Sequence, residues 1–362
     1  MMDFDAFIKD IKDNNWNVFG VELYQKGELV NHWGDTFNIH EIYSATKGIT
    51  SIAVGIAYDE GLIDFDKSIL EYLPKDRVKS LSKKQYERFE KISVRRLLTM
   101  SVADFPFRPE GEDWLEYSLA CDINPDIIQF NYSNIPVYII CVALTNIFGC
   151  DLGEFIEKRI FAPMDITSFE YGRSPEGYFY GSSNMLLSVH DLSKFALLLY
   201  NKGVYNGIRI VSEEYVDLAT SVQMMNREGG YGFYFWRYRS GYSINGKWKQ
   251  KCYIIPKQEI IITYLSHIED DSQDLKCSME KHIFGIGDKE EKAFKRIAEM
   301  EELFDKISSG EGTARDVKKL DSYYTGADWR FDFELDEAGL LPANLKHGVL
   351  SEDGIYNLLE KD

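Results

Sequence analysis

Few of the features that mark membrane-spanning or secreted proteins occur in this sequence. The longest apolar run, residues 135–144, is too short to cross a bilayer. The first seven residues, Met1 to Phe7, have neither a basic start nor an apolar core, so we expect no secretory signal. Both absences favour a cytoplasmic protein without a membrane partner.

Cysteine and histidine motifs are also scarce. The five cysteines form no Cys-x-x-Cys pair, and their odd number and mostly apolar neighbours are typical of reduced core thiols. His-Glu-x-x-His is absent, and we predict neither a metal nor a cofactor. Gly-x-Ser-x-Gly is absent as well, which argues against a Ser-His-Asp hydrolase. We expect His190 and His267 to cap helices or to make hydrogen bonds in the core.

Positive charge is in deficit. The chain has 41 Lys and Arg against 59 Asp and Glu, a net charge of −18, and its basic residues are scattered. A nucleic-acid partner needs a basic patch, so we exclude one. At 362 residues the chain is too long for one small core, and we predict two domains, residues 1–285 and residues 286–362.

What the sequence does contain is a hydroxyl and an amine at the start of an apolar helix. From Ile49 the apolar residues recur at positions 49, 52, 53, 56 and 57, which predicts a helix with one buried face. Ser44 and Lys47 precede this stripe and lie three residues apart, so the amine can reach the hydroxyl. A serine becomes nucleophilic only beside a base, and burial can lower the pKa of a lysine enough for that role.

The spacing alone is weak evidence. Ser-x-x-Lys also occurs at Ser80 and at Ser278, but neither begins a helix that looks buried. A solvated pair or a helix cap is the alternative interpretation of Ser44 and Lys47. Tyr132-Ser133-Asn134 is more informative, because Tyr-x-Asn occurs once in the chain and stands directly before an apolar helix from Val137 to Phe148.

The strand pattern predicts one antiparallel sheet. Residues 17–25 and 28–33 form an N-terminal hairpin, and residues 231–239, 241–255 and 259–267 form three later strands, with turns near Asn245-Gly246 and Pro256-Lys257. We expect an α+β fold, an α/β sandwich in which helices cover this sheet and a helical insert lies between its two halves. Ser93 and Ser188 are expected to cap helices.

Together these motifs resemble those of the serine β-lactamase and penicillin-binding-protein superfamily, in its class C-like esterase and amidase branch, over about residues 15–270. The resemblance implies that Ser44 attacks an ester or amide and that Lys47 and Tyr132 share the general-base and general-acid work. It also implies that Asn134 holds the substrate or Lys47. We expect the pKa of Tyr132 to be lowered by the nearby ammonium.

The third motif of that family is altered. Counting back along a single strand from Pro256 places it at Gly241-Tyr242-Ser243, with the N–H of Ile244 as the second oxyanion donor and these residues as substrate contacts. Gly241 stands where relatives carry a cation, which favours small esters or amides over penicillin-like substrates. We interpret Lys247 and Lys249 as exposed turn residues. The altered motif leaves a second hypothesis open, a catalytically inactive binding or regulatory protein with the same fold.

The segment from about residue 289 resembles a small bacterial domain family of unknown function, marked by Tyr323-Tyr324, Trp329 and residues 348–354. A charged helix over residues 289–307 begins it. The remainder has too few residues for a large core, so we expect a small, mainly helical module. Its expected role is a packing appendage or a site for a protein partner.

Overall fold

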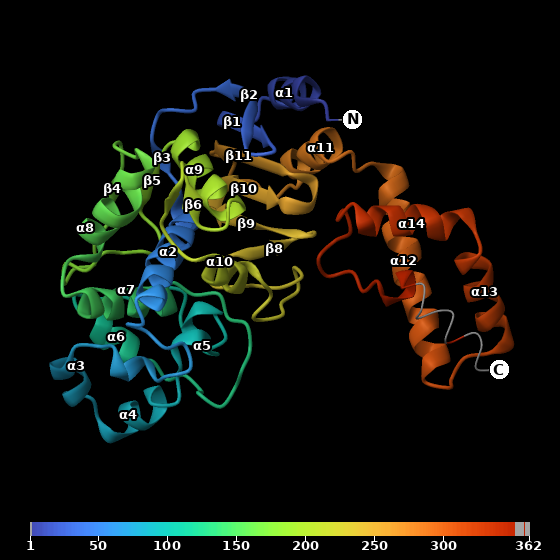
Figure 1. The fold of residues 1–362 in the computed structure, drawn as a ribbon. Coiled ribbons are helices and arrows are strands. Elements are labelled where there is room, and N and C mark those ends of the chain that lie inside the picture. Colours follow the sequence, from blue (N-terminus) through green and yellow to red (C-terminus); the bar gives the residue numbers. More distant parts are fainter. Residues whose placement is uncertain (1, 352–357, 359–362) are drawn as a thin grey trace.

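The computed structural model describes residues 2–351 and residue 358, and its centre is an antiparallel sheet covered by helices on both faces (Figure 1). The strand order is β2-β1-β11-β10-β9-β8. The strands span β1 (Val18–Gln25), β2 (Glu28–Gly34), β8 (Trp236–Tyr238), β9 (Gly241–Gly246), β10 (Gln250–Ile255) and β11 (Ile260–Ser266). The N-terminal hairpin therefore joins the later strands through β1 and β11, as the α+β prediction requires.

One face of the sheet is covered by the chain's first helix and by a later one. The helices α1 (Phe4–Asp13) and α11 (Asp274–Ile283) pack there, and Phe7, Ile11 and Met279 are buried between them and the sheet. The other face carries α2 (Thr46–Asp59), α9 (Val189–Tyr200) and α10 (Glu213–Thr220). Ser188 caps α9 through the Asp191 N–H, as predicted.

The helical insert lies beyond α2. Its helices are α3 (Lys75–Lys79), α4 (Lys83–Phe89), α5 (Val94–Leu98), α6 (Trp114–Ala120), α7 (Ile135–Phe148) and α8 (Leu152–Ile156). Ser93 caps α5, as predicted. Short strands complete this region: β3 (His40–Glu41), β4 (Glu170–Tyr171), β5 (Met185–Leu187), β6 (Val204–Tyr205) and β7 (Ile208–Arg209). Within the described residues no single helix has the length and apolarity of a membrane span, although α7 and the segment 152–164 pass that test together as a pair bent by 76°.

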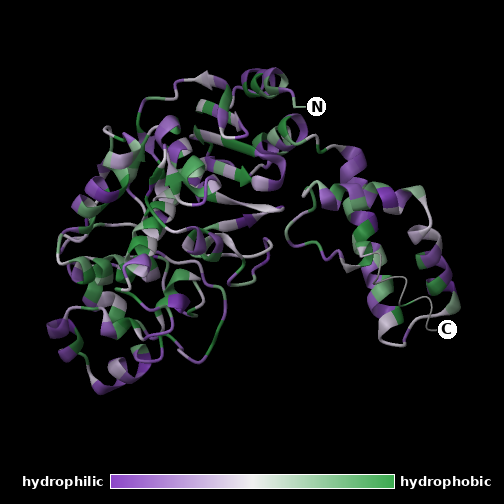
Figure 2. Cartoon of the chain, in the orientation of Figure 1, coloured by the Kyte–Doolittle hydropathy of each residue, from purple (hydrophilic) through white to green (hydrophobic). Residues whose placement is uncertain are grey.

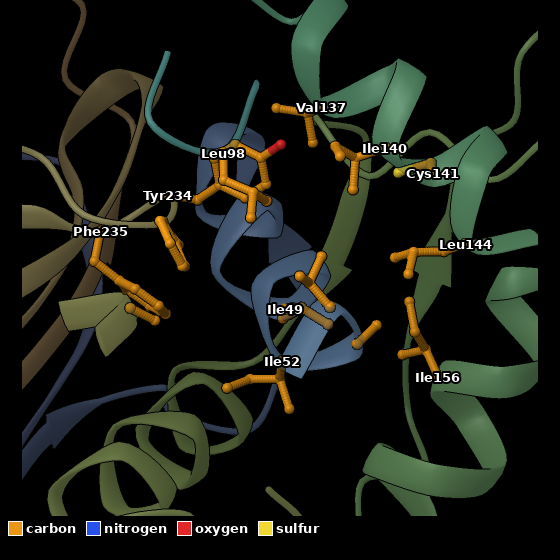
Figure 3. Packing of buried hydrophobic residues seen from close by; sticks show 14 of the residues in the cluster. Ile49, Ile52, Leu98, Val137, Ile140, Cys141, Leu144, Ile156, Tyr234 and Phe235 are labelled. Atoms are coloured by element: carbon orange, nitrogen blue, oxygen red, sulfur yellow. The ribbon is translucent and has the colours of Figure 1, made fainter. Parts of the chain in front are cut away.

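The helix α2 is buried on every side, so the prediction of a single buried face is wrong. Every residue from Thr46 to Ala57 is buried, because α2 runs between the sheet and the insert. Figure 3 shows Ile49 and Ile52 of α2 between residues of α7, such as Leu144, and Phe235 near the sheet. A helix that must be apolar all round is typical of the centre of a large domain.

The predicted strand 241–255 is two strands. The chain reverses at Lys247–Lys249, where Trp248 and Lys249 adopt left-handed φ values of 55° and 67°. Gly246 then pairs with Gln250 across the new hairpin of β9 and β10. The reversal lies directly after Asn245-Gly246, near which the sequence predicts a turn.

The C-terminal segment has its own small core. Its helices are α12 (Asp288–Ser308), α13 (Ala314–Tyr324) and α14 (Ala327–Glu337), and Ile297, Leu320 and Trp329 pack together between them. The alternation of hydrophobic and hydrophilic residues on these helices is visible in Figure 2. Residues 352–354 of the predicted signature lie outside the described residues. The division at residue 285 stays a prediction.

The close packing of α2 yields a first test. A Cβ at Gly55 would lie 2.5 Å from the ring of Tyr215, so Gly55→Ala should overpack the contact between α2 and α10. We expect a loss of about 1–3 kcal/mol of stability, seen as a lower midpoint of thermal unfolding. Gly287→Ala is the control, because its Cβ would meet only Glu290 Oε2 at 3.7 Å. Equal midpoints for the two variants would contradict this packing.

Candidate active site

Ser44 lies in a single turn directly before α2. The 3₁₀ turn Tyr43–Ala45 leads into the helix at Thr46, and Ser44 is partly exposed there. Tyr43 has a φ of 48°, a left-handed value that a bulky residue rarely adopts and that occurs at functional sites. The serine is therefore held at the surface end of a buried helix, where a carbonyl compound can reach it.

The amine of Lys47 lies beneath Ser44 and contacts three oxygens. Its Nζ is 3.0 Å from Ser44 Oγ, 2.7 Å from Asn134 Oδ1 and 2.8 Å from the Ser182 carbonyl oxygen. Lys47 is only 1% exposed. The amide and carbonyl oxygens can only accept hydrogen bonds. When the amine is neutral, its two hydrogens therefore stay on these two oxygens, and its lone pair faces the Ser44 hydroxyl.

Burial favours the neutral form of the Lys47 amine. It lowers the pKa of Lys47 from 10.5 to about 7, since removing the ammonium from water is costly and no carboxylate is among its hydrogen-bond partners. A lysine with this pKa is about half neutral at neutral pH. This is the property that the sequence analysis required of a base beside Ser44.

Tyr132 lies beside both Ser44 and Lys47. Its hydroxyl lies near enough to Ser44 for that side chain to affect the pKa of the phenol, and the centroid of its ring lies 5.0 Å from Lys47 Nζ. The expected lowering of its pKa is wrong: burial raises the pKa of Tyr132 to about 12. Lys47 is not among the groups that shift the pKa of Tyr132, and the neighbouring Tyr180 raises it further. Tyr132 therefore stays a protonated phenol at neutral pH.

Asn134 joins the site to its supporting residues. Its Oδ1 accepts from Lys47, and its Nδ2 donates to Tyr180 Oη at 2.9 Å. Its backbone carbonyl accepts from Ser182 Oγ at 2.8 Å. Asn134 is the residue before α7, and its side chain makes no cap to that helix, which leaves the amide free to face Lys47.

Two supporting residues were missed from the sequence, Tyr180 and Ser182. Both belong to the segment before β5, which showed only a helix cap at Ser188. A signal does exist at Gly181, because a Cβ there would lie 2.2 Å from Thr50 Oγ1 of α2. Only a glycine lets this segment approach α2 closely enough for the Ser182 carbonyl to reach Lys47.

The third predicted segment lies along β9. Tyr242 and Ile244 face α2, where Tyr242 packs near Phe235 and Ile244 lies beside Gly48. Ser243 points to the opposite face of the sheet. The strand comes closest to the serine segment at Gly246, where a Cβ would lie 2.2 Å from the Ile42 carbonyl oxygen.

The assignment of a second oxyanion donor to Ile244 stays a prediction. The described pairing of β8 with β9 ends at Ser243, which leaves the edge of β9 from Ile244 onward beside the serine segment. Lys247 is exposed, as expected. Lys249 is not: its side chain is 17% exposed and donates to Asp270 Oδ1 at 2.9 Å.

The two histidines singled out in the sequence each pair with a glutamate. His190 Nδ1 lies 3.0 Å from Glu22 Oε1, and His267 Nε2 lies 2.9 Å from Glu269 Oε1, so both are in hydrogen-bonded pairs away from Ser44. Over the part of the chain that the structure describes, no group of three or more His, Cys, Asp or Glu side chains could hold a metal ion. The ionisable groups that lie beside Ser44 are the amine of Lys47 and the phenol of Tyr132.

Solved structures with the same architecture show what the chain is similar to. A family VIII carboxylesterase has a TM-score of 0.61 at 16% identity, covering 78% of this chain and 95% of its own. A D-stereospecific amidohydrolase from Streptomyces sp. has a TM-score of 0.60 at 15% identity, with 79% and 100% covered. A penicillin-binding protein homolog from Caulobacter crescentus has a TM-score of 0.58 at 13% identity, with 74% and 91% covered.

Family models cover almost the whole sequence. No curated protein matches the chain. The model described as a domain of unknown function (DUF4298) matches residues 286–362, so the C-terminal segment carries that domain. The model described as beta-lactamase matches residues 10–278, about three quarters of the chain. With this match, and with an antiparallel sheet, a helical insert and a buried helix behind Ser44 in place, the chain belongs to the beta-lactamase family.

Proposed function

We propose that the protein is a serine hydrolase that cleaves a small ester or amide through an acyl-enzyme on Ser44. The observation that carries the proposal is the position of Lys47 Nζ, whose other two partners are obligatory acceptors, so that its lone pair faces Ser44 Oγ. The carboxylesterase and amidohydrolase among the structural neighbours support esters and amides as the substrate class.

Acylation follows from these contacts. Ser44 Oγ bonds to the substrate carbonyl carbon while its proton passes to neutral Lys47 Nζ. The tetrahedral intermediate collapses as the bond to the leaving group breaks, and the Tyr132 phenol donates its proton to the leaving oxygen or nitrogen. The Lys47 ammonium then returns a proton to the Tyr132 phenolate, so the base and the acid are both restored. Deacylation repeats the sequence with water as the nucleophile.

The raised pKa of Tyr132 suits an acid better than a base. A phenol with a pKa of about 12 keeps its proton until a more basic alkoxide or amide nitrogen develops. Lys47, with a pKa of about 7, is the group that can accept a proton at neutral pH. The two roles that the sequence left shared between Lys47 and Tyr132 are therefore assigned separately here. Asn134 acts on Lys47 by fixing the direction of its amine.

The first test asks whether Ser44 reacts. We expect a fluorophosphonate probe to label Ser44, as mapped by peptide mass spectrometry, and Ser44→Ala to lose the label. Hydrolysis of a short-chain nitrophenyl ester by the wild type should exceed that by Ser44→Ala at least about a thousandfold. Ser80→Ala is the matched control, because Ser80 has the same spacing to a lysine but lies in an exposed segment. Wild type that is unlabelled and no faster than Ser44→Ala would favour the non-catalytic binding protein instead.

The second test is the pH dependence of the reaction. The ammonium form of Lys47 has no lone pair, so kcat/KM for a neutral ester should rise with pH through a midpoint near 7 and level off above it. Tyr132→Phe should lower the plateau and leave the midpoint in place. A wild-type midpoint near the ordinary lysine value would show that Lys47 is not the base.

The third test alters the charge beside Lys47. Asn134→Asp places a carboxylate 2.7 Å from Nζ in the position of the present amide oxygen, and an opposite charge at this distance raises a lysine pKa. We expect the pH midpoint of kcat/KM to move up by about one unit or more. Asn146→Asp makes the same change at the exposed far end of α7 and should leave the midpoint unmoved. Identical profiles for the two variants would refute the contact between Asn134 and the base.

A further inference from the structure

A groove of about 960 Å³ lies on the sheet face that is turned away from α2. Its floor is formed by β8, β9 and β10, including Ser243, Asn245 and Lys251, and one wall is the hairpin turn at Trp248. The opposite wall belongs to the C-terminal segment, through residues 342–344 and Phe294 of α12. This volume is in the range that small-molecule sites occupy.

Two aromatic contacts connect the groove to the Ser44 site. Trp236 lines the groove, and its ring centroid lies 5.4 Å from that of Tyr132. Trp248 lines it as well and lies 5.0 Å from Tyr43, the residue before Ser44. Between Trp236 and Trp248, the residues of β9 that follow Ser243 are not paired with β8 among the described residues. The reactive serine and the groove thus adjoin the same short edge of the sheet.

The floor of the groove carries a cation that no described carboxylate neutralises by contact. Lys251 of β10 is half-buried, and no hydrogen bond or ion pair of its ammonium is found among the described residues. Burial, with help from Lys276 and Lys249, lowers its pKa to about 8, which keeps it mainly charged at neutral pH. A buried and uncompensated ammonium is costly unless an anion meets it.

The acidic side chains of the groove are largely engaged elsewhere. Asp270 accepts from Lys249, and Glu280 accepts from Arg239 at 2.9 Å. Glu269 is paired with His267. Glu228 attracts Lys251 electrostatically, but it is exposed and makes no described ion pair with it. The remaining charged residues that line the groove are Asp271, Glu291, Arg237, Lys247, Lys276 and Lys295.

Asn245 stands directly opposite Lys251 across the two strands. Its Oδ1 is buried and has no hydrogen-bond partner among the described residues. A ligand that satisfies both side chains needs an anionic acceptor for the ammonium and an N–H or O–H donor for the amide. A carboxylate next to such a donor has this chemistry.

We propose that the groove binds a carboxylate next to an N–H or O–H donor, with the carboxylate on Lys251 and the donor on Asn245 Oδ1, and that this group is the far end of the substrate whose ester or amide is cleaved at Ser44. The second half of the proposal rests on the proposed function. The Lys251 ammonium on β10 would then provide the positive charge that is missing from the third motif, where Gly241 stands on β9. The altered third motif alone favours substrates without a carboxylate, so the experiment below distinguishes the two.

The C-terminal domain gains a role in this arrangement, because it closes the groove. Arg239 donates to the Leu340 carbonyl, and the Ser240 N–H donates to the Gly339 carbonyl at 3.3 Å, so residues 339–340 are tied to the β8–β9 turn. Ala343 packs directly against Gly229, in the loop before Tyr231 and Trp236. The wall at residues 342–344 is therefore anchored on the sheet domain at two places.

The experiment compares nitrophenyl esters of matched chain length that end in a carboxylate or in a methyl group. The quantity measured is the ratio of their kcat/KM values, in wild type, Lys251→Met, Lys251→Arg and Lys67→Met. We expect wild type to favour the acid-ended ester, with the ratio falling about tenfold or more in Lys251→Met. Lys251→Arg should keep most of the preference. Lys67→Met, the same change at an exposed lysine on the helical side, should keep all of it.

Direct binding separates this proposal from the proposed function. Hydroxy dicarboxylates of the same lengths are titrated calorimetrically into full-length Ser44→Ala and Ser44→Ala/Lys251→Met. Binding that depends on Lys251, with a matching ester preference, supports the proposal. Binding that depends on Lys251 without any ester preference overturns the link to the substrate and leaves a separate anion site. Absent binding, or equal binding by the two proteins, overturns the site itself, whether or not the esters are cleaved.

Discussion

The amine of Lys47 is the group on which the rest of the site depends. It is 1% exposed and lies against three oxygens that come from three separate parts of the chain, Ser44, Asn134 and Ser182. An ammonium in that position is expensive, and the free energy that its burial costs appears as a pKa of about 7. The same burial that would destabilise a charged lysine is what makes a neutral one available as a base.

The architecture can be understood as the means of burying that amine. The helix α2 is enclosed between the sheet and the helical insert, so its first turn presents Lys47 inward and Ser44 outward. Glycines permit the close approaches on either side: Gly181 brings the Ser182 carbonyl to α2, and Gly246 brings β9 to the carbonyl of Ile42. The insert contributes Tyr132 and Asn134 from the start of α7. No single domain layer could supply all of these groups.

The sequence was informative where reactive side chains stand directly before an apolar helix. Ser44 and Lys47 stand at the head of an apolar helix, and Tyr132 and Asn134 stand before another, so the antiparallel fold and the meeting of these four side chains were predictable. Ser182 was not, because it contributes a backbone carbonyl, which every residue has. A turn near Asn245-Gly246 was predicted, but the position of the reversal at residues 247–249 was not, since it depends on left-handed φ values at Trp248 and Lys249, residues that seldom adopt them. The raised pKa of Tyr132 depends on burial, which the sequence does not give.

The low pKa of the Lys47 amine can be measured without a substrate. The pH titration of the Lys47 side chain, followed by NMR of protein labelled at the lysine ε carbon and assigned with Lys47→Met, reports this pKa directly. We expect a midpoint near 7, well below those of the surface lysines. A Lys47 signal that titrates with the surface lysines, near the ordinary value of 10.5, would contradict the role of the buried amine as a base.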